Sequence, residues 1–201
     1  MRSHSIFVLA ACLLCIAVGA SAGTVVFSDN FAADTLGLGV TNLGSQWTVT
    51  AGNVDVIGTN SSWNFYPGNG QYLDLDGTGP ASPSTNATIQ TFESFGPGAY
   101  TLTFDLGNNP GGGSEINTLQ ILWGATQVGY LTTSGTMALT PETITFTATE
   151  AGKLSFAQGG APTQQGSILA NVQLASATPE PGTFAILGAG LIGLGLLRRR
   201  K

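Results

Sequence analysis

Residues 98–107 read GAYTLTFDLG and alternate apolar with polar side chains. The larger apolar side chains are Tyr100, Leu102, Phe104 and Leu106, and the residues between them are threonine or aspartate. Successive residues of an extended strand point to opposite sides, so apolar side chains at every second position share one face. The pattern therefore predicts a strand with one buried face and one polar face.

The same period of two recurs along the chain. In residues 143–149, Ile144, Phe146 and Ala148 alternate with threonines. Clusters of Gly, Pro and Asn, densest in residues 67–70 and 108–113, are typical of turns and separate the apolar runs. Further short strands are expected at residues 24–27, 47–50, 53–57, 71–75, 88–92, 119–123, 127–132, 153–157 and 168–174.

Many short strands without an amphipathic helix predict an all-β fold, an antiparallel β-sandwich or jelly roll. About 155 residues, 23–177, lie between two unusual terminal segments. That length suits one domain with its own core, whereas two domains would be cramped. We therefore expect a single β-sandwich ectodomain over residues 23–177.

Residues 1–22 have the features of a secretory signal peptide. Arg2 supplies a positive start, residues 6–18 are apolar, and Ala20-Ser21-Ala22 forms a small-residue cleavage site. The mature chain would then begin at Gly23. One alternative stays open, because residues 9–12 (LAAC) fit a loose bacterial lipobox, which would make Cys12 a lipidated N-terminus.

The composition of residues 23–177 excludes several kinds of site. All Cys and His residues of the chain lie in the first 22 positions, which excludes disulfides, thiolate zinc sites and Ser-His-Asp triads from the ectodomain. Residues 23–177 contain ten acidic residues and a single basic one, Lys153, so their net charge is −9. This balance argues against nucleic acid and anionic lipid as partners, and it suits cation binding or solubility outside the cell.

The last 24 residues, 178–201, differ from the rest of the chain. Pro179 and Pro181 fix their own φ angles and disfavour helix in the residues before them, so residues 178–182 should be extended. The sixteen uncharged residues 182–197 would span ~24 Å as a helix, short of a hydrocarbon core of ~30 Å. A basic tip, Arg198, Arg199, Arg200 and Lys201, should stay in the cytoplasm.

The order of these features resembles the PEP-CTERM sorting signal of bacterial envelope proteins. The motif is Pro179, Glu180 and Pro181, followed by a transmembrane helix at residues 183–197 and the basic tip at 198–201. The resemblance implies that exosortase, a membrane protease-transferase, is a partner. It also implies that the protein is first anchored in the inner membrane and then reaches the cell surface or extracellular matrix after processing. The alternative is a permanent C-terminal anchor.

The ectodomain is more loosely similar to galactose-binding-like jelly-roll domains. The similarity lies in residues 52–58 (GNVDVIG), 67–77 (PGNGQYLDLDG) and 98–105 (GAYTLTFD). Such domains often close with an Asp-Asn-Val triplet, whereas the matching segment here is Leu169-Ala170-Asn171-Val172. Because the side chain of Ala170 has no ligating atom, a contact carried by that acid in the family does not transfer to this chain.

Asp74 and Asp76 are candidate ligands for Ca²⁺. Acids two apart on a strand point the same way, and the following Gly77 allows a sharp turn that brings backbone carbonyls toward a hard cation. The alternative is that both acids are solvated on the outer face of a strand that ends in a turn.

Trp63, Phe65 and Tyr66 are candidate carbohydrate contacts. They lie in a polar stretch rich in Gly, Ser and Asn, where exposed aromatic rings could form a platform for sugar stacking. The alternative is that these rings anchor the loop to the core. Trp47 and Trp123 fall within strand patterns and are predicted to be buried.

No pair of carboxylates stands out as the acid and base of a glycosidase, so we expect no enzymatic activity. Two functions remain open at this stage. One is an exported surface protein that binds carbohydrate or associates with exopolysaccharide through a jelly-roll domain. The other is a purely structural component of the matrix or cell surface, without a specific ligand.

Overall fold

The computed structural model describes residues 23–44, 46–79 and 86–177. The predicted signal peptide, the Pro-Glu-Pro motif, the predicted transmembrane helix and the basic tip all lie outside these ranges. Within the described ranges, no helix is long and apolar enough to cross a membrane.

Twelve strands and one short 3-10 helix, η1 (Pro110–Gly112), form the described region. The strands are β1 (Thr24–Asp29), β2 (Gly37–Val40), β3 (Trp47–Ala51), β4 (Val54–Ile57), β5 (Tyr72–Asp74), β6 (Thr88–Thr91), β7 (Gly98–Asn108), β8 (Ile116–Trp123), β9 (Thr126–Ser134), β10 (Thr140–Ala148), β11 (Leu154–Gly159) and β12 (Ser167–Ser176).

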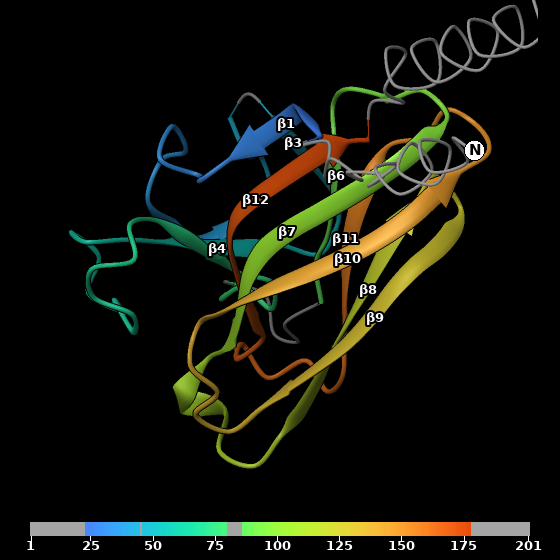
Figure 1. Cartoon of the computed structure of the whole chain (residues 1–201). Coiled ribbons are helices and arrows are strands. Elements are labelled where there is room, and N and C mark those ends of the chain that lie inside the picture. The colour runs from blue at the N-terminus through green and yellow to red at the C-terminus, as the bar shows by residue number, and fades with distance from the viewer. Residues whose placement is uncertain (1–22, 45, 80–85, 178–201) are drawn as a thin grey trace, which may run out of the picture. The chain divides into compact units, whose positions relative to one another are not determined.

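The strands form two antiparallel sheets that pack face to face as a β-sandwich, as predicted. The larger sheet has the order β10-β7-β12-β5-β4-β2, with β1 also paired to β12, and the smaller sheet has the order β3-β6-β11-β8-β9. Figure 1 shows the two layers, with β12, β7 and β10 side by side in one and β11, β8 and β9 in the other.

The alternation in β7 is confirmed. Tyr100, Leu102, Phe104 and Leu106 are all buried, and they belong to the main core between the sheets. Trp47 is 0% exposed and Trp123 is 6% exposed, as the strand patterns predicted. Sequence periodicity therefore identified the core face of the sandwich correctly.

Strand β12 lies in the middle of the larger sheet and changes its neighbour along its length. It pairs with β7 on one side throughout, while on the other side Ile168 and Leu169 pair with β5 and residues 172–176 pair with β1. The register to β7 shifts between Ala170 and Gln173. Asn171 sits in this bulge with a left-handed φ of 49° and donates a hydrogen bond from Nδ2 to Asp105 Oδ2 at 2.6 Å.

Eleven of the twelve strands overlap a predicted run, and β2 is the one that was missed. Its sequence, GLGV, offers neither alternation nor a run of β-branched residues. Gly39 of β2 has a left-handed φ of 63°, and a Cβ atom there would collide with the carbonyl oxygen of Thr78. Tertiary contact rather than local propensity therefore holds this edge strand in place.

Candidate functional site

Side chains of β4, β5 and β12 alternate between the main core and the outer face of the larger sheet. Leu73 and Leu75 belong to the core, so Asp74 and Asp76 point to the outer face together, as predicted. Neither acid is solvated there, because both are 0% exposed. The alternative to the calcium site, that both acids are solvated, is therefore wrong, because loops cover this part of the sheet.

A second, smaller apolar cluster lies on the same outer face. It contains Ile57, Tyr72, Ile168 and Ala170, and it is covered by partly buried Phe65, Tyr66 and Leu139. The outer face of β4, β5 and β12 thus carries an apolar patch next to buried acids. The loops that carry Phe65, Tyr66 and Leu139 cover the patch, and the loop that carries residues 163–165 covers the acids.

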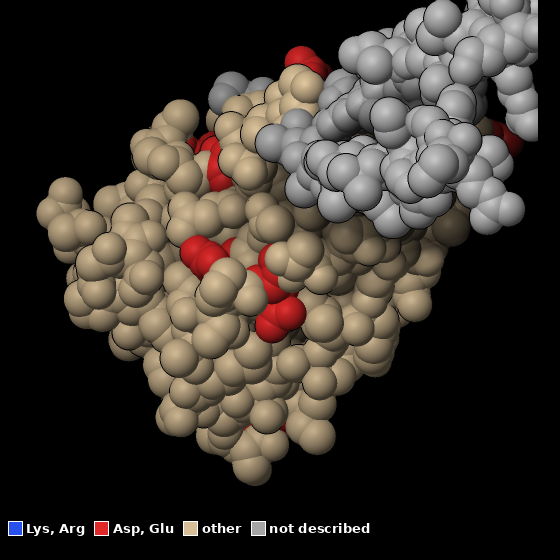
Figure 2. Space-filling model, in the orientation of Figure 1, with Lys and Arg blue, Asp and Glu red and all other residues tan. Residues whose placement is uncertain are grey.

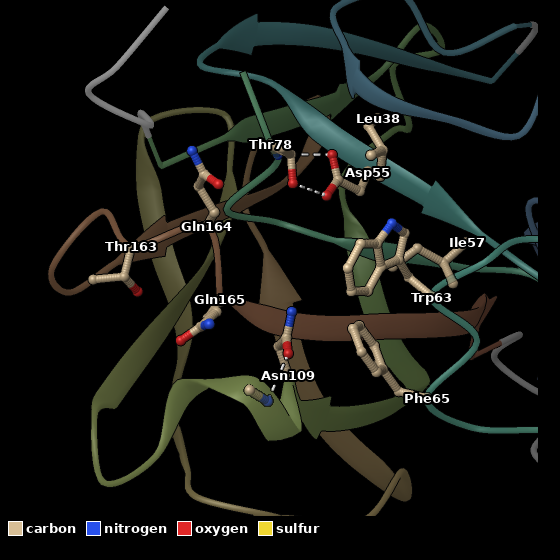
Figure 3. A pocket seen from close by; sticks show the side chains of 11 residues that line it. Leu38, Asp55, Ile57, Trp63, Phe65, Thr78, Asn109, Thr163, Gln164 and Gln165 are labelled. Carbon is tan, nitrogen blue, oxygen red and sulfur yellow. Dashed lines mark hydrogen bonds between the residues drawn. The ribbon is translucent and has the colours of Figure 1, made fainter. Parts of the chain in front are cut away.

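A cavity of about 270 Å³ opens between these loops. We call it the candidate site; its lining consists of Leu38, Asp55, Ile57, Trp63, Phe65, Thr78, Asn109, Gly111, Thr163, Gln164 and Gln165. Figure 3 shows the rings of Trp63 and Phe65 on one side of the cavity and the two glutamines across from them. An apolar wall and an amide wall therefore face each other.

The aromatic wall is positioned by the buried hydroxyl of Tyr72. This oxygen accepts hydrogen bonds from the backbone N–H of Phe65 at 2.7 Å and of Tyr66 at 3.1 Å, and it donates to Asn64 Oδ1 at 3.1 Å. Burial raises the pKa of Tyr72 above its usual value. The loop that carries Trp63 is thus anchored at its base, while the indole itself is 56% exposed.

The structure brings Trp63 and Phe65 together in the candidate site, but it places Tyr66 elsewhere. The Tyr66 hydroxyl lies 2.7 Å from the carbonyl oxygen of Met137 and also approaches that of Asn108. Its ring packs edge to face on Tyr72, with centroids 5.7 Å apart. Tyr66 therefore anchors the loop through the small cluster beneath the site.

Asp55 backs one end of the cavity and is 4% exposed. Its Oδ1 accepts from the backbone N–H of Gly39 at 2.8 Å and of Thr78 at 2.7 Å, and its Oδ2 accepts from Thr78 Oγ1 at 2.8 Å. The dashed bonds in Figure 3 show how this carboxylate holds Thr78. Asp55 thereby fixes β2 against the 78–79 segment.

Asp76 shapes the amide wall. Its Oδ2 accepts from the backbone N–H groups of Thr163 at 2.6 Å, Gln164 at 2.7 Å and Gln165 at 3.3 Å. Gln164 has a left-handed φ of 68°, which is uncommon for a residue other than glycine. Three successive N–H groups around one carboxylate oxygen form an anion-binding nest. The acid therefore stabilises a loop conformation that the sequence alone would disfavour.

Asp74 holds the third side of the cavity. Its Oδ1 accepts from the backbone N–H of Asp76 at 3.0 Å and of Gly166 at 2.9 Å, and its Oδ2 accepts from Asn109 Nδ2 at 2.7 Å. Asn109 in turn accepts from Gly111 N at 2.9 Å and so caps η1. Burial raises the pKa of Asp74 to about 7, and the three donors partly oppose this shift.

The contacts of Asp74 and Asp76 bear on the calcium hypothesis. Both oxygens of Asp74 and Oδ2 of Asp76 face N–H donors, whose hydrogens occupy the positions that a cation would need. Asp74 and Asp76 have four carboxylate oxygens between them. Of these four, only Asp76 Oδ1 has no hydrogen-bond partner within the described residues. No group of three or more His, Cys, Asp or Glu side chains within those residues is arranged to hold a metal. The arrangement favours a hydrogen-bonding role for both acids.

A buried polar cluster lies next to the candidate site, at the end of the sandwich where β7, β9 and β11 finish. We call it the amide cluster; its members are Asn108, Asn117, Thr133, Gln158 and Ser167. Asn117 Nδ2 donates to Asn108 Oδ1 at 2.9 Å and also to the carbonyl oxygen of Gln165 at 2.8 Å. The cluster therefore connects the cavity to the interior of the sandwich.

The electrostatic character of the candidate site is negative. Asp55 is its one charged lining residue, and within the described ranges no Lys or Arg lines it. Figure 2 shows scattered acidic atoms on one face of the described region and no basic ones. Lys153 lies at the opposite end of the sandwich, where its carbonyl oxygen accepts from Gly124 N at 2.9 Å.

Sequence reasoning missed Asp55, Tyr72, Asn109 and the two glutamines. The sequence did carry a signal for Asp55, which is the one acid in an otherwise apolar strand, between Val54 and Val56. An acid that is buried in such a strand needs hydrogen-bond partners. The glutamines and Asn109 carried no local signal. They reach the cavity only because the loops before β12 and after β7 meet over the larger sheet.

Comparisons with known proteins bear on the C-terminal segment and on the fold. Residues 177–201 match the PEP-CTERM protein-sorting motif, as the Pro-Glu-Pro element and the basic tip predicted. The chain therefore carries this sorting signal. No curated protein matches the sequence at a significant level.

Several solved structures are similar in fold to this chain. The K2 cleaved adhesin domain of Lys-gingipain has a TM-score of 0.51 at 14% identity, with 74% of this chain and 98% of that domain covered. The CBM22-1 xylan-binding domain of Xyn10C from Paenibacillus barcinonensis has a TM-score of 0.50 at 13% identity, with 78% of this chain and 97% of that domain covered. At these identities the likeness shows the fold.

A xylanase 10B structure from Clostridium thermocellum, with CBM22-1 and GH10 modules in complex with xylohexaose, is also similar. Its TM-score is 0.48 at 11% identity, and the match covers 77% of this chain. The chain spans 29% of the length of that protein.

Proposed function

We propose that this chain is an exported, exosortase-sorted surface protein whose β-sandwich binds carbohydrate without catalysis and associates with exopolysaccharide. The sorting motif at residues 177–201 supports the route. The fold is shared with a domain described as xylan-binding, which supports the ligand class. A non-catalytic role agrees with the acids of the site, since Asp55, Asp74 and Asp76 are each engaged by N–H donors.

One observation carries the proposal: an exposed indole stands over a cavity whose opposite wall is made of amides. Sugars have apolar C–H faces that pack on aromatic rings and hydroxyls that need hydrogen-bond partners. Trp63 and Phe65 supply the first kind of surface, and Gln164 and Gln165 supply the second. The cavity lies just below the range of about 300–1,000 Å³ usual for small-molecule sites, which suits a short segment of a glycan.

The test is retention of the purified full chain on a glycan array, with Trp63→Ala beside it. We expect Trp63→Ala to abolish retention while it changes the free energy of unfolding by less than ~1 kcal/mol, because the indole is largely exposed. Phe92→Ala is the matched control, since Phe92 is also an exposed aromatic residue, at 45%, and does not line the cavity. It should leave retention intact.

Two outcomes would contradict this proposal, the first for carbohydrate binding itself and the second for the role of Trp63 in it. No retention on any glycan would leave the structural alternative, a matrix protein without a ligand. Large destabilisation by Trp63→Ala, with retention unchanged per folded molecule, would make Trp63 a loop anchor instead.

The sorting part has a separate test in the native host. Mass spectrometry of the mature protein should find an N-terminus at Gly23 and a C-terminus close to Glu180, without the residues from Phe184 onward. Glu180→Ala should leave uncut protein in the membrane, whereas a plain anchor would ignore this change. Recovery of mature protein that still ends at Lys201 would establish a permanent anchor.

A further inference from the structure

Trp63 stands between two hollows rather than at the edge of one. The first is the candidate site, and the second has a volume of about 260 Å³. Both are lined by Trp63, Leu38 and Ile57. The second hollow adds the short polar side chains of Asn60, Ser61 and Ser62.

The shared residues form an apolar border between the two hollows, which we call the ridge. Trp63 is 56% exposed and Leu38 is 49% exposed, while Ile57 beneath them is buried. The turn before the ridge is fixed, because Ser61 N donates to the carbonyl oxygen of Gly58 at 2.9 Å. A single sugar would fill one hollow and leave the other empty. A chain that crosses the ridge would use both hollows and stack on the indole between them.

The charges around the hollows restrict the chemistry of that chain. Asp55 backs the first hollow, and the described residues that line either hollow include no Lys or Arg. A carboxylate, sulfate or phosphate on the ligand would be desolvated beside a like charge with no cation to pair it. Hydroxyl groups meet no such penalty, since they can donate to Asp55 Oδ2 and accept from the glutamine amides.

We propose that the site binds an internal segment of an uncharged glycan chain that lies across Trp63 from one hollow to the other. This inference rests on the proposed function and adds to it the length and the charge of the ligand. Asp55 is then a specificity-determining residue, because it rejects acidic glycans.

The first experiment varies chain length and charge with the full protein. Oligosaccharides of increasing length from cellulose, mannan and xylan are the neutral probes, and oligomers of polygalacturonate and alginate are the acidic ones. For the neutral series that binds, we expect affinity to rise by about tenfold or more from the shortest to the longer oligomers and then level off. Acidic oligomers of equal length should bind at least about tenfold more weakly.

The second experiment blocks each hollow separately. Ser62→Tyr fills the second hollow from an exposed position that lines only that hollow, and Gln165→Ala removes an amide that lines only the first. Ser62→Tyr should weaken the long oligomers by about tenfold and leave the shortest unchanged, whereas Gln165→Ala should weaken both. Unchanged melting temperatures serve as the folding control.

Asp55→Asn tests the charge directly. The new amide oxygen can still accept from Gly39 N and Thr78 N, and its nitrogen can donate to Thr78 Oγ1, so the local hydrogen bonds survive. The ratio of acidic to neutral binding should then rise. If Asp55→Asn does not fold, the comparison of acidic with neutral oligomers on the unsubstituted protein still tests whether the site rejects acidic glycans.

The outcomes separate the two levels of inference. Equal affinity for short and long neutral oligomers, or equal affinity for acidic and neutral ones, would overturn the present inference and leave carbohydrate binding in place. Failure to bind any of the probes and any glycan on the array would overturn the proposed function itself.

Discussion

The two ends of the sandwich are held together by different kinds of interaction. At the end where β7 and β11 begin, aromatic rings fill the space between the sheets: Tyr100 and Trp123 have centroids 4.7 Å apart, and Trp123 and Phe146 have centroids 5.2 Å apart. At the opposite end, the amide cluster fills the space between the sheets. Thr133 Oγ1 donates to Asn108 Oδ1 at 2.7 Å, and Gln158 Nε2 donates to Asn117 Oδ1 at 2.9 Å.

The candidate site lies at the amide end, where its loops are held by directional contacts. Packing between rings is weakly directional, so an aromatic end can absorb small displacements, whereas a buried hydrogen bond is lost when its geometry fails. The loops of the site depend on such bonds, since Asn117 holds the Gln165 carbonyl and Asp74 holds Asn109. Stability and site geometry are therefore separable by mutation.

The largest effect on stability is expected from the aromatic core. Trp47 is fully buried between Phe27 and Phe156, and its Nε1 donates to Asp29 Oδ2 at 2.9 Å. Trp47→Ala should lower the free energy of unfolding by ~3–5 kcal/mol in urea titrations. Glycan retention per folded molecule should not change. A loss of less than ~1 kcal/mol would mean that this end of the core is not tightly packed.

The next effect is a pH dependence that arises at the amide end. Because burial raises the pKa of Asp74 from 3.8 to about 7 in the folded state, the folded protein holds a proton that the unfolded chain has released. The free energy of unfolding should therefore be highest at acidic pH and fall as the pH rises through about 7, by at most ~1.4 kcal/mol per pH unit for this residue.

Urea titrations between acidic and mildly alkaline pH measure this dependence. Burial also raises the pKa of Asp76, which adds a change of the same sign. Asp74→Asn should flatten the profile, because the amide does not titrate. The double variant Asp74→Asn/Asn109→Asp restores a donor–acceptor pair at this contact and should recover part of the stability that Asp74→Asn loses. A profile that rises with pH would contradict the buried, partly protonated state of Asp74.

Asp76→Ala should have a smaller effect on stability and a large one on the site. Removal of the carboxylate leaves three backbone N–H groups without their acceptor, and we expect a loss of ~1–3 kcal/mol together with loss of glycan retention. Asp76→Asn is the control, because its oxygen can replace Oδ2 and its nitrogen can take the place of the unpartnered Oδ1. Retention by the Ala variant would show that the amide wall forms without Asp76.

The smallest effect is expected from calcium. N–H donors already occupy Asp74 and one oxygen of Asp76, so millimolar Ca²⁺ or a chelator should leave the melting temperature of the full chain unchanged. A ligand that binds only the folded state would raise it by mass action. If Ca²⁺ raises the melting temperature of the unchanged protein but not that of Asp76→Asn, the calcium hypothesis would be restored. The hydrogen-bonding role of these acids would then be wrong.

The two ends also differ in how far the sequence predicted them. Alternation in β7 placed Tyr100 and Phe104 in the core, and strand patterns placed Trp47 and Trp123 there, because burial of one strand face leaves a local pattern. The amide end left none. Its bonds join residues distant in sequence, such as Asp74 with Asn109 and Asp76 with Thr163, and β2 is an edge strand defined by contact with the 78–79 segment. Of the residues that line the cavity, only Trp63 and Phe65 were identified, from the composition of their loop.

The central position of β12 has a mechanical consequence. This strand ends at Ser176, next to the sorting signal, and Ala177 N still donates to the carbonyl oxygen of Ala99 at 2.8 Å. Tension applied to the chain at residue 177 would pull along β12, which is bonded to β7 on one flank and to β1 and β5 on the other. Such a load shears many hydrogen bonds at once instead of opening them one by one. A domain tethered through its C-terminus would thus resist extraction by fluid drag.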